Sequence, residues 1–369
     1  GGQGAFIGEV HRAAARLDGK YLFCAGALSS NPKKSIESGK ELGLDEDRIY
    51  ETYEDMILKE SKREDSIEAV SIVTPNNLHF PITKCCLDAG YHVICDKPFT
   101  LTRNEADQLV EIANSKNLIL AVTYNYSGYP MVRQAKAMIK DGDIGNIRVI
   151  QAEYAQGWLS EPLEREGHKQ AAWRTDPEIA GIAGCVADIG THAYHLVCFI
   201  SGLMPTSICA DVSKFVEGRK LEDNANILLR FDGDATGMIW VSQVAIGISN
   251  GLKLRIFGDK GGLEWNQESP NELIFSALNE PSRKITSGSP NSKIETSRVS
   301  RLPSGHPEGY LEAFANLYSE IGDSIMNARL GQFTATTAST PSGYDGKRGV
   351  IFVESVIRSS SRGSVWVNL

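Results

Sequence analysis

The first third of the chain alternates continuous apolar runs with amphipathic segments. Four continuous apolar runs are predicted to be strands: 21–29, 67–75, 91–98 and 118–124. Three amphipathic segments between them are predicted to be helices: 31–44, 80–90 and 102–117. Strands that are apolar on both faces and alternate with helices are typical of a parallel sheet covered on both sides. Residues 1–125 are therefore predicted to form an α/β domain.

After residue 125 the runs become longer, and apolar and polar residues alternate along them. Six such runs are predicted to be strands: 146–157, 206–216, 224–233, 236–246, 252–258 and 262–268. Four further segments are predicted to be helices or to close the fold: 130–141, 189–201, 308–327 and 344–360. This pattern indicates an α+β domain over 126–369 with a large, mainly antiparallel open sheet. Its last helix is expected to pack back on the first domain.

Length, charge and cysteine content narrow the function classes. A chain of 369 residues is too long for one ordinary core, which agrees with two domains. The net charge of −8 argues against a nucleic-acid partner, and no apolar run approaches the roughly 20 residues of a membrane helix. The seven cysteines form no C-x-x-C pair, so we expect reduced thiols in a cytoplasmic protein.

The first eight residues, GGQGAFIG, contain four glycines and lead into an amphipathic helix. Glycines in such a turn let the backbone approach a phosphate, which the free N–H groups of the helix then bind. Ile7 stands where the third glycine of a dinucleotide fingerprint is expected, and the strand expected before the turn is missing from the chain. A flexible terminus is the alternative, but the alternating strands favour a Rossmann domain. The candidate cofactor contacts here are Gly2, Gly4, Ala5, Phe6 and Ile7.

The predicted strand over 21–29 ends in GALSSNPKK, where many NAD-binding domains carry a carboxylate for the ribose 2′-hydroxyl. This chain has Ser29, Ser30 and Lys33 instead. Hydroxyl and ammonium groups suit a 2′-phosphate better than a carboxylate does, which favours NADP over NAD. Alternatively, Lys33 and Lys34 form a solvated helix face, and both cofactors stay open.

Two stretches follow predicted parallel strands: TPNNLH (74–79) and CDKP (95–98). Ligands of open α/β sheets bind at the carboxyl ends of the strands. Pro98 holds the backbone of Lys97 extended and so limits where its side chain can point. An ordinary strand-ending turn has the same appearance.

The stretch GCVADIGTHAYHL (184–196) places Asp188, His192 and His195 in an apolar setting, where polar groups need a partner or a function. Asp188 and His192 are four residues apart, so both would lie on one side of a continuous helix. The intervening Gly-Thr pair predicts instead that the helix begins there, with Asp188 free near its N-terminus. A zinc site is the rival interpretation, but no third ligand is evident and no metal is expected. For His195, a core histidine bonded to backbone is the simpler interpretation.

In this order and spacing, these motifs resemble the family of glucose–fructose oxidoreductase, inositol dehydrogenase and the rhizopine-catabolism oxidoreductases (Gfo/Idh/MocA). The resemblance spans essentially the whole chain and includes AWRTDPEIAGIAGCVADIGTH and GHPEGYLEAF. Within the family the chain is most similar to bacterial sugar and cyclitol dehydrogenases, including levoglucosan dehydrogenase. The resemblance implies NAD(P)-dependent hydride transfer at a secondary hydroxyl of a sugar, anhydrosugar or cyclitol. It also implies a homodimer or homotetramer formed through the second-domain sheet.

The resemblance further implies roles for matching residues. Asp96 and Lys97 correspond to the family's Glu-Lys-Pro motif, whose lysine contacts the substrate hydroxyl and the cofactor. His192 corresponds to the general base and Asp188 to a residue that holds substrate, while many relatives carry aspartate where this chain has His195. A histidine, with a usual pKa of about 6.5, suits proton abstraction, and an ammonium can stabilise the developing alkoxide.

The remaining candidate contacts fall into two groups. Beside Asp96 and Lys97, the expected cofactor contacts are Thr74, Pro75, Asn76, His79, Asn125, Trp173 and Arg174. The expected substrate contacts are Tyr126, Gln156, Trp158, Asp188, His192 and His195. Aromatic faces beside hydrogen-bonding groups suit a polyhydroxylated ring. Alternatively, Trp158 and Trp173 only fill the domain junction.

Two other functions are compatible with this fold. One is a glycosidase that uses NAD for a transient oxidation, and the other is a non-enzymatic sensor that binds NAD(P). The presence of Lys97, Asp188 and His192 argues against the sensor. Net production of NAD(P)H from a polyol would separate a dehydrogenase from a glycosidase.

Overall fold

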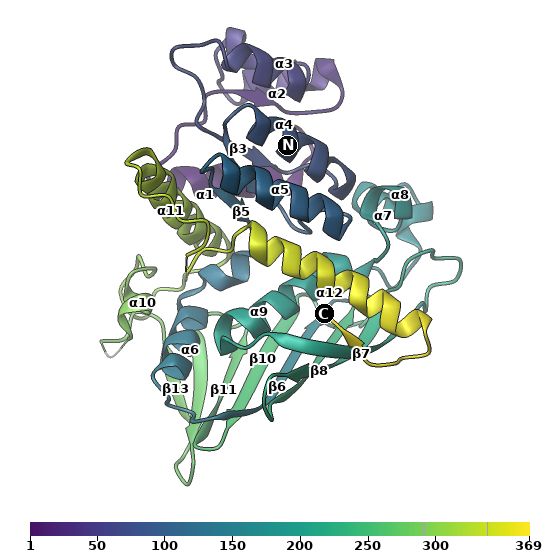
Figure 1. The fold of residues 1–369 in the computed structure, drawn as a ribbon, viewed down its shortest axis with the longest axis vertical. Coiled ribbons are helices and arrows are strands. Elements are labelled where there is room, and N and C mark those ends of the chain that lie inside the picture. Colours follow the sequence, from purple (N-terminus) through teal and green to yellow (C-terminus); the bar gives the residue numbers. More distant parts are fainter. Residues whose placement is uncertain (291, 338) are drawn as a thin grey trace. The chain divides into compact units, whose positions relative to one another are not determined.

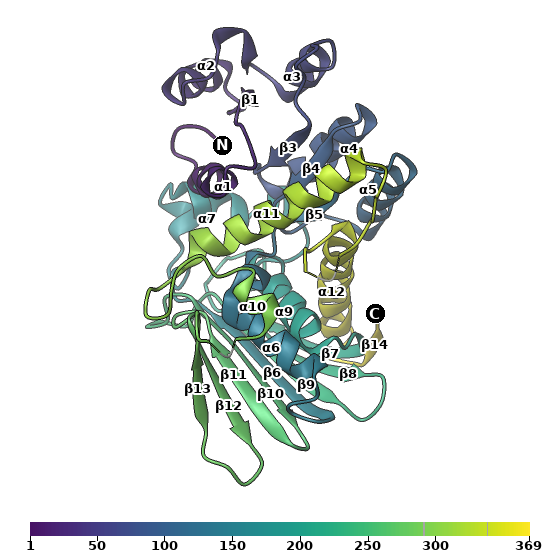
Figure 2. The same cartoon turned by 90° about the vertical axis from the view of Figure 1, so that its left-hand side faces the viewer.

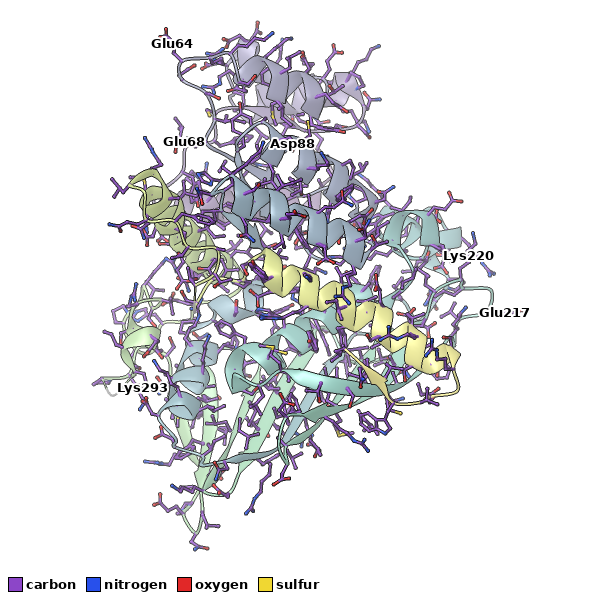
Figure 3. All side chains as sticks on the ribbon, viewed as in Figure 1. Glu64, Glu68, Asp88, Glu217, Lys220 and Lys293 are labelled. Atoms are coloured by element: carbon purple, nitrogen blue, oxygen red, sulfur yellow. The ribbon has the colours of Figure 1, made fainter. Side chains whose placement is uncertain are left out.

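A computed structural model gives the fold of residues 1–290, 292–337 and 339–369 (Figures 1 and 2). Charged side chains such as Glu64 and Glu217 are exposed to solvent (Figure 3). Within these ranges no helix is both long enough and apolar enough to cross a membrane.

The chain divides into two compact units. The first unit comprises Gly1–Thr123 and Phe314–Lys347, and the second comprises Tyr124–Ala313 and Arg348–Leu369. The sequence pattern had suggested that 126–369 forms one domain. The structure instead assigns residues 314–347 to the first unit.

The first unit contains two small parallel sheets with helices around them. Three strands form one sheet in the order β3 (Ala69–Ile72), β4 (His92–Cys95) and β5 (Leu120–Val122). Two strands form the other, β1 (Gly26–Ala27) and β2 (Ile49–Tyr50). The helices are α1 (Phe6–Leu17), α2 (Pro32–Glu41), α3 (Tyr53–Glu60), α4 (His79–Asp88), α5 (Arg103–Ser115) and most of α11 (Tyr310–Arg329). Alternating strands and helices with parallel pairing confirm the predicted Rossmann-type architecture.

The predicted strand over 21–29 is largely wrong, because only β1 is paired. Among the described residues no strand is hydrogen-bonded to 21–25, and within this run the side chains of Leu22 and Phe23 are 87% and 40% exposed. An apolar run becomes a strand only where a neighbour satisfies its backbone groups. The two-residue β2 is too short to give a periodic signal and was not predicted.

Helix ends in this unit follow local sequence signals. Asn31 caps α2 by accepting a hydrogen bond from the backbone N–H of Lys34, and Pro32 occupies the first turn. Thr102 and Glu105 form a reciprocal capping box at the start of α5. These capping residues explain why both helices begin close to the positions predicted from the sequence.

The second unit is built on a nine-stranded sheet. Its order is β13 (Arg283–Thr286), β12 (Glu272–Ala277), β11 (Gly261–Asn266), β10 (Gly251–Gly258), β6 (Ile147–Ala155), β9 (Thr236–Ser242), β8 (Asn224–Phe231), β7 (Pro205–Ser213) and β14 (Val367–Asn368). Neighbouring strands are antiparallel except for β6 and β9, which run parallel. This confirms the predicted large, mainly antiparallel sheet, although β12, β13 and β14 were not predicted.

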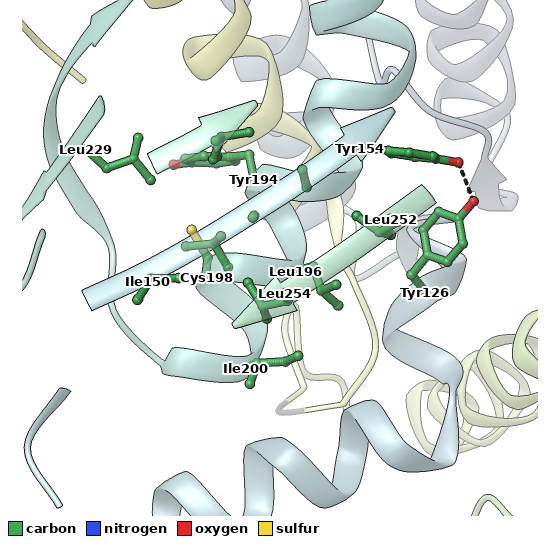
Figure 4. Packing of buried hydrophobic residues seen from close by; sticks show 14 of the residues in the cluster. Tyr126, Ile150, Tyr154, Tyr194, Leu196, Cys198, Ile200, Leu229, Leu252 and Leu254 are labelled. Carbon is green, nitrogen blue, oxygen red and sulfur yellow. Dashed lines mark hydrogen bonds between the residues drawn. The ribbon is translucent and has the colours of Figure 1, made fainter. Parts of the chain in front are cut away.

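Helices cover one face of this sheet and form the core of the second unit with it (Figures 1 and 2). They are α6 (Pro130–Lys140), α9 (Thr191–Ser201) and the second half of α12 (Gly343–Ser361). Figure 4 shows Leu196 and Ile200 of α9 with Ile150 of β6 and Leu254 of β10. All four side chains are buried. Apolar side chains at alternate strand positions therefore hold α9 on the sheet.

α9 continues a helical segment that already starts at Cys185. Val186–Gly190 forms a π-helical turn, and α9 follows at Thr191 without a break. The prediction that the helix begins at the Gly-Thr pair is therefore wrong, because Gly190 has helical backbone angles and Asp188 lies inside the segment. Single π-helical turns of this kind occur frequently at functional sites.

The buried Glu222 fixes the start of this helical segment. Its Oε1 accepts hydrogen bonds from the N–H groups of Gly184 (2.8 Å) and Val186 (3.0 Å), and its backbone carbonyl accepts one from Cys185 (3.1 Å). The first N–H groups of a helix have no partners within the helix itself, so these three bonds satisfy them. Burial raises the pKa of Glu222 to about 7.

The raised pKa predicts a pH-dependent stability contribution from Glu222. Because the folded protein holds this proton more tightly than the unfolded chain, the contribution is full below pH 4.5 and is lost as the pH rises through about 7. Relative to Glu222→Gln, wild type should lose about 3 kcal/mol of unfolding free energy over that interval. Urea unfolding of both proteins at pH 5 and pH 8 measures this difference. A difference that does not change with pH would contradict the assignment.

Candidate active site

The glycine-rich start forms a tight turn. The N–H of Gly2 donates to the carbonyl of Leu28 at 2.8 Å, and a Cβ at Gly2 would lie 2.2 Å from Ser38 Oγ. A Cβ at Gly8 would lie 2.7 Å from the carbonyl oxygen of Gly1. Gly8 therefore supplies the close packing expected of the third fingerprint glycine, and the residue before it need not be glycine.

The turn leads directly into the N-terminus of α1. Gly4 has a positive φ of 71°, a conformation that favours glycine. Ala5 precedes the helix and offers no polar side chain to cap the first N–H groups, which begin at Phe6. Uncapped N–H groups after a glycine turn form an anion site. The N–H groups at the start of α1 would therefore hold the pyrophosphate of a dinucleotide.

The residues after β1 are placed at the start of α2. Ser29 Oγ accepts a hydrogen bond from the N–H of Asn31 at 3.1 Å. Ser30 and Lys33 are exposed beside it. Ser29 thus has a local role in the turn, while Ser30 and Lys33 present a hydroxyl and an ammonium to solvent.

His79 links two loops of the first unit. Its Nδ1 lies 2.7 Å from the carbonyl oxygen of Pro98 and its Nε2 lies 2.9 Å from that of Thr74. Burial lowers the pKa of His79, while Asp96 and the contacts with the two carbonyl oxygens act in the opposite direction. His79 therefore holds the loops after β3 and β4 together. The buried hydroxyl of Thr74 has no hydrogen-bond partner among the described residues, and Asn76 is buried beside this loop.

The loop after β4 carries Asp96 and Lys97. Asp96 Oδ1 accepts hydrogen bonds from the N–H of Lys97 and from the hydroxyl of Thr123, both at 2.8 Å. The Lys97–Pro98 peptide bond is cis. Lys97 itself is half-buried. The carboxylate of Asp96 thus fixes the backbone from which the Lys97 side chain leaves.

In the second unit, Asp188 is held by two side chains. Its Oδ2 accepts hydrogen bonds from Gln243 Nε2 at 2.8 Å and from Arg174 Nε at 3.3 Å. The guanidinium of Arg174 also lies over the ring of Trp173, 4.1 Å from its centroid. Gln170 contributes as well, because its Oε1 accepts from Arg174 Nη1 at 2.6 Å. These contacts orient the carboxylate of Asp188 on the helical segment.

Three tyrosines surround His192, which is 6% exposed. Its ring meets those of Tyr126, Tyr124 and Tyr154 edge to face, with centroids 4.8, 5.8 and 6.1 Å away. Asp188 precedes it by four residues on the same helical segment. Asp188 and His192 thus lie four residues apart on one continuous helical segment, and their roles toward a substrate stay predictions.

His195 lies in a stack of aromatic rings. Its ring stacks on Tyr124 at 4.4 Å and on Phe199 at 5.6 Å between centroids. The ammonium of Lys136 lies 3.7 Å from the centroid of Phe199. The neighbours of His195 are those of a packed core histidine, and a substrate contact stays a prediction.

The predicted substrate residues Tyr126, Gln156 and Trp158 belong to one hydrogen-bonded network. Tyr154 and Asn250 complete it, and Figure 4 shows the bond between Tyr126 and Tyr154. The sequence analysis missed Tyr154 and Asn250 because neither lies in a motif. Alternation along β6 and β10 predicts strands but does not show which polar residues meet.

Asn125 lies in the 3₁₀ turn Asn125–Gly128, and its buried Nδ2 has no partner in the described part of the chain.

Among the residues that the structure describes, no three His, Cys, Asp or Glu side chains are arranged to hold a metal ion. Asp188 and His192 of the second unit and Lys97 of the first unit are residue types suited to proton transfer and to stabilising a developing negative charge.

The sequence matches known families over both units. Residues 2–124 match the oxidoreductase family with an NAD-binding Rossmann fold, and residues 132–264 match the GFO/IDH/MocA C-terminal domain. The chain is 36% identical to the uncharacterized oxidoreductase YfiI of Bacillus subtilis, over 100% of this chain and 94% of that protein.

Solved structures agree with this assignment. An oxidoreductase from Sinorhizobium meliloti is 47% identical, with a TM-score of 0.89 over 99% of this chain and 97% of the other. An inositol dehydrogenase homolog from Azotobacter vinelandii, complexed with NADH and myo-inositol, is 35% identical, with a TM-score of 0.93 over 100% and 95%. The chain therefore belongs to the Gfo/Idh/MocA family of NAD(P)-dependent oxidoreductases.

Proposed function

We propose that this oxidoreductase transfers hydride between NAD(P) and a secondary hydroxyl of a sugar, anhydrosugar or cyclitol. The main support is that Asp188 and His192 lie on one helical segment, with Asp188 bonded to Gln243 and Arg174. The Azotobacter homologue, whose structure contains NADH and myo-inositol, supports a cyclitol or a similar polyol as substrate.

Each residue has one role in the proposed reaction. Oxidising a secondary alcohol removes a hydride from the carbon and a proton from the oxygen, and NAD(P), when bound, supplies the hydride acceptor. His192 takes the hydroxyl proton and returns it in the reverse reaction. The ammonium of Lys97 stabilises the charge that develops on the oxygen. Asp188 accepts a hydrogen bond from a second substrate hydroxyl while Gln243 and Arg174 hold its carboxylate.

The uncovered face of the nine-stranded sheet supports the proposed homodimer or homotetramer. Leu228 of β8 and Met238 of β9 are 48% and 43% exposed on this chain. They are paired residues on adjacent strands. Apolar side chains gathered on one sheet face are typical of an interface.

Replacing Lys97 or His192 with Ala should lower kcat by roughly 10²-fold or more, because each acts on the reacting oxygen. Binding of NAD(P), followed by quenching of protein fluorescence, should stay within a few-fold of wild type. Lys84→Ala and His306→Ala are matched controls, since both side chains are partly or fully exposed and outside the candidate site. A near-normal kcat in either site variant would defeat the assignment.

Replacing Ser30 with Asp should shift the cofactor preference toward NAD. A carboxylate there can accept from a ribose 2′-hydroxyl and repels a 2′-phosphate. The ratio of kcat/KM for NADP to that for NAD should fall on the order of tenfold. Ser61→Asp changes the charge of the same unit by the same amount at another exposed site and should leave the ratio unchanged. An unaltered ratio in Ser30→Asp would remove the argument for NADP.

A further inference from the structure

Five side chains of the second unit form a hydrogen-bonded network. Trp158 Nε1 lies 3.0 Å from Gln156 Oε1, and Gln156 Nε2 lies 2.8 Å from Asn250 Oδ1. Tyr154 donates to the same Asn250 oxygen at 2.7 Å, and its hydroxyl lies 2.5 Å from that of Tyr126. A longer contact of 3.4 Å joins Asn250 Nδ2 to the Tyr126 hydroxyl. The network therefore runs from an indole on one side to a phenol on the other.

The indole determines the direction of every bond in this network. An indole nitrogen can only donate, so the oxygen of the Gln156 amide must face Trp158 and its nitrogen must face Asn250. The oxygen of Asn250 must therefore face Gln156, and Tyr154 can only donate to it. Tyr154 has a single hydroxyl proton and donates it to Asn250. The hydrogen bond between the two tyrosine hydroxyls must therefore be donated by Tyr126.

These directions leave two groups with fixed roles toward a ligand. The proton of Tyr126 is used on Tyr154, so its oxygen can only accept from any further group. Gln156 Nε2 has a second N–H that can only donate, and the Gln156 side chain is half-buried. Tyr126 is also the tyrosine nearest to His192, with ring centroids 4.8 Å apart. An acceptor and a donor of fixed polarity thus belong to the same cluster as the proposed base.

We propose that Asn250 and Tyr154 are positioning residues that set the substrate specificity of this site. They hold Tyr126 as an acceptor and Gln156 as a donor, and Trp158 fixes the polarity of both. The substrate recognised this way carries one hydroxyl that donates to Tyr126 and a nearby oxygen that accepts from Gln156. Adjacent hydroxyls, or a hydroxyl beside a ring or ether oxygen, have this pattern. The inference rests on the proposed polyol oxidation and adds the pattern of donors and acceptors by which the site recognises its substrate.

Gln156→Glu tests this pattern because it replaces the donating amide of residue 156 with an accepting carboxylate of almost the same shape. A carboxylate oxygen facing Asn250 can only accept, so the Asn250 amide must turn its nitrogen toward it. Tyr154 then accepts from Asn250 and donates to Tyr126, so the Tyr126 proton is no longer used on Tyr154 and can be donated to a ligand or to the Asn250 oxygen that now lies beside it. We expect KM for the polyol to rise at least tenfold, while kcat and KM for NAD(P) change by less than threefold.

A fluorinated substrate gives a second readout that a merely structural role would not move. Fluorine cannot donate a hydrogen bond, so wild type should discriminate strongly against an analogue with fluorine in place of the hydroxyl that meets Tyr126. In Gln156→Glu that discrimination should shrink at least fivefold, because Tyr126 can then donate. Equal discrimination by the two proteins would overturn the inference.

Two further variants separate polarity from loss of an indole. Trp158→Phe removes the donor that orients Gln156 and leaves the Tyr126 side chain itself unchanged. It should therefore also raise KM for the polyol. Trp240→Phe is the matched control, because its indole donates to Asn224 Oδ1 at 3.0 Å outside the network. Trp240→Phe should leave KM unchanged. A similar KM increase in both variants would show a general packing effect and overturn the inference.

Turnover by wild type distinguishes failure of this inference from failure of the proposed function. If wild type oxidises polyols and Gln156→Glu keeps its KM within twofold, only the inference fails. If wild type oxidises none, the proposed function fails, and calorimetric binding of the same polyols to both proteins decides the inference. A weaker affinity in Gln156→Glu would support it, whereas equal affinities or no binding to wild type would overturn it.

Discussion

The second unit depends on how a buried helical segment satisfies the N–H groups at its start. Glu222 accepts two of these bonds with its side chain and a third with its backbone. The backbone carbonyl of the next residue, Asp223, accepts a hydrogen bond from the backbone N–H of Gln243 at 2.8 Å. The side chain of Gln243 in turn donates a hydrogen bond to Asp188. The same pair of strand ends thus fixes both the start of the segment and its carboxylate. With Asp188 oriented, His192 follows one helical turn later.

In the first unit, side chains also fix the backbone near the candidate site, here at the carboxyl ends of the strands. His79 joins the loops after β3 and β4 through Thr74 and Pro98, and Asp96 joins β4 to the end of β5 through Thr123. Loops at this edge must present groups to a ligand without collapsing onto one another. Cross-links between them give a fixed starting point for the Lys97 side chain.

Sequence alone predicted the features that rest on local signals. Short local segments of the sequence determine the capped helices, the alternating strands and the spacing of Asp188 and His192. The structure contains each of these features. The strand over 21–29 failed because pairing needs a neighbour that an apolar run does not specify. The helix start failed because Glu222 supports it from 36 residues away. Asn250 was missed for a similar reason, because its partners come from distant strands.

The central claim is that this chain oxidises polyols with net transfer of hydride to NAD(P). Absorbance at 340 nm, recorded with wild type, NAD or NADP and a panel of sugars, inositols and anhydrosugars, tests it most directly. We expect a steady rise in absorbance with at least one polyol, and we expect His192→Ala to abolish it. Tight binding of NAD(P) without reduction by any member of the panel would contradict it, as would hydrolysis of a glycoside without net NAD(P)H.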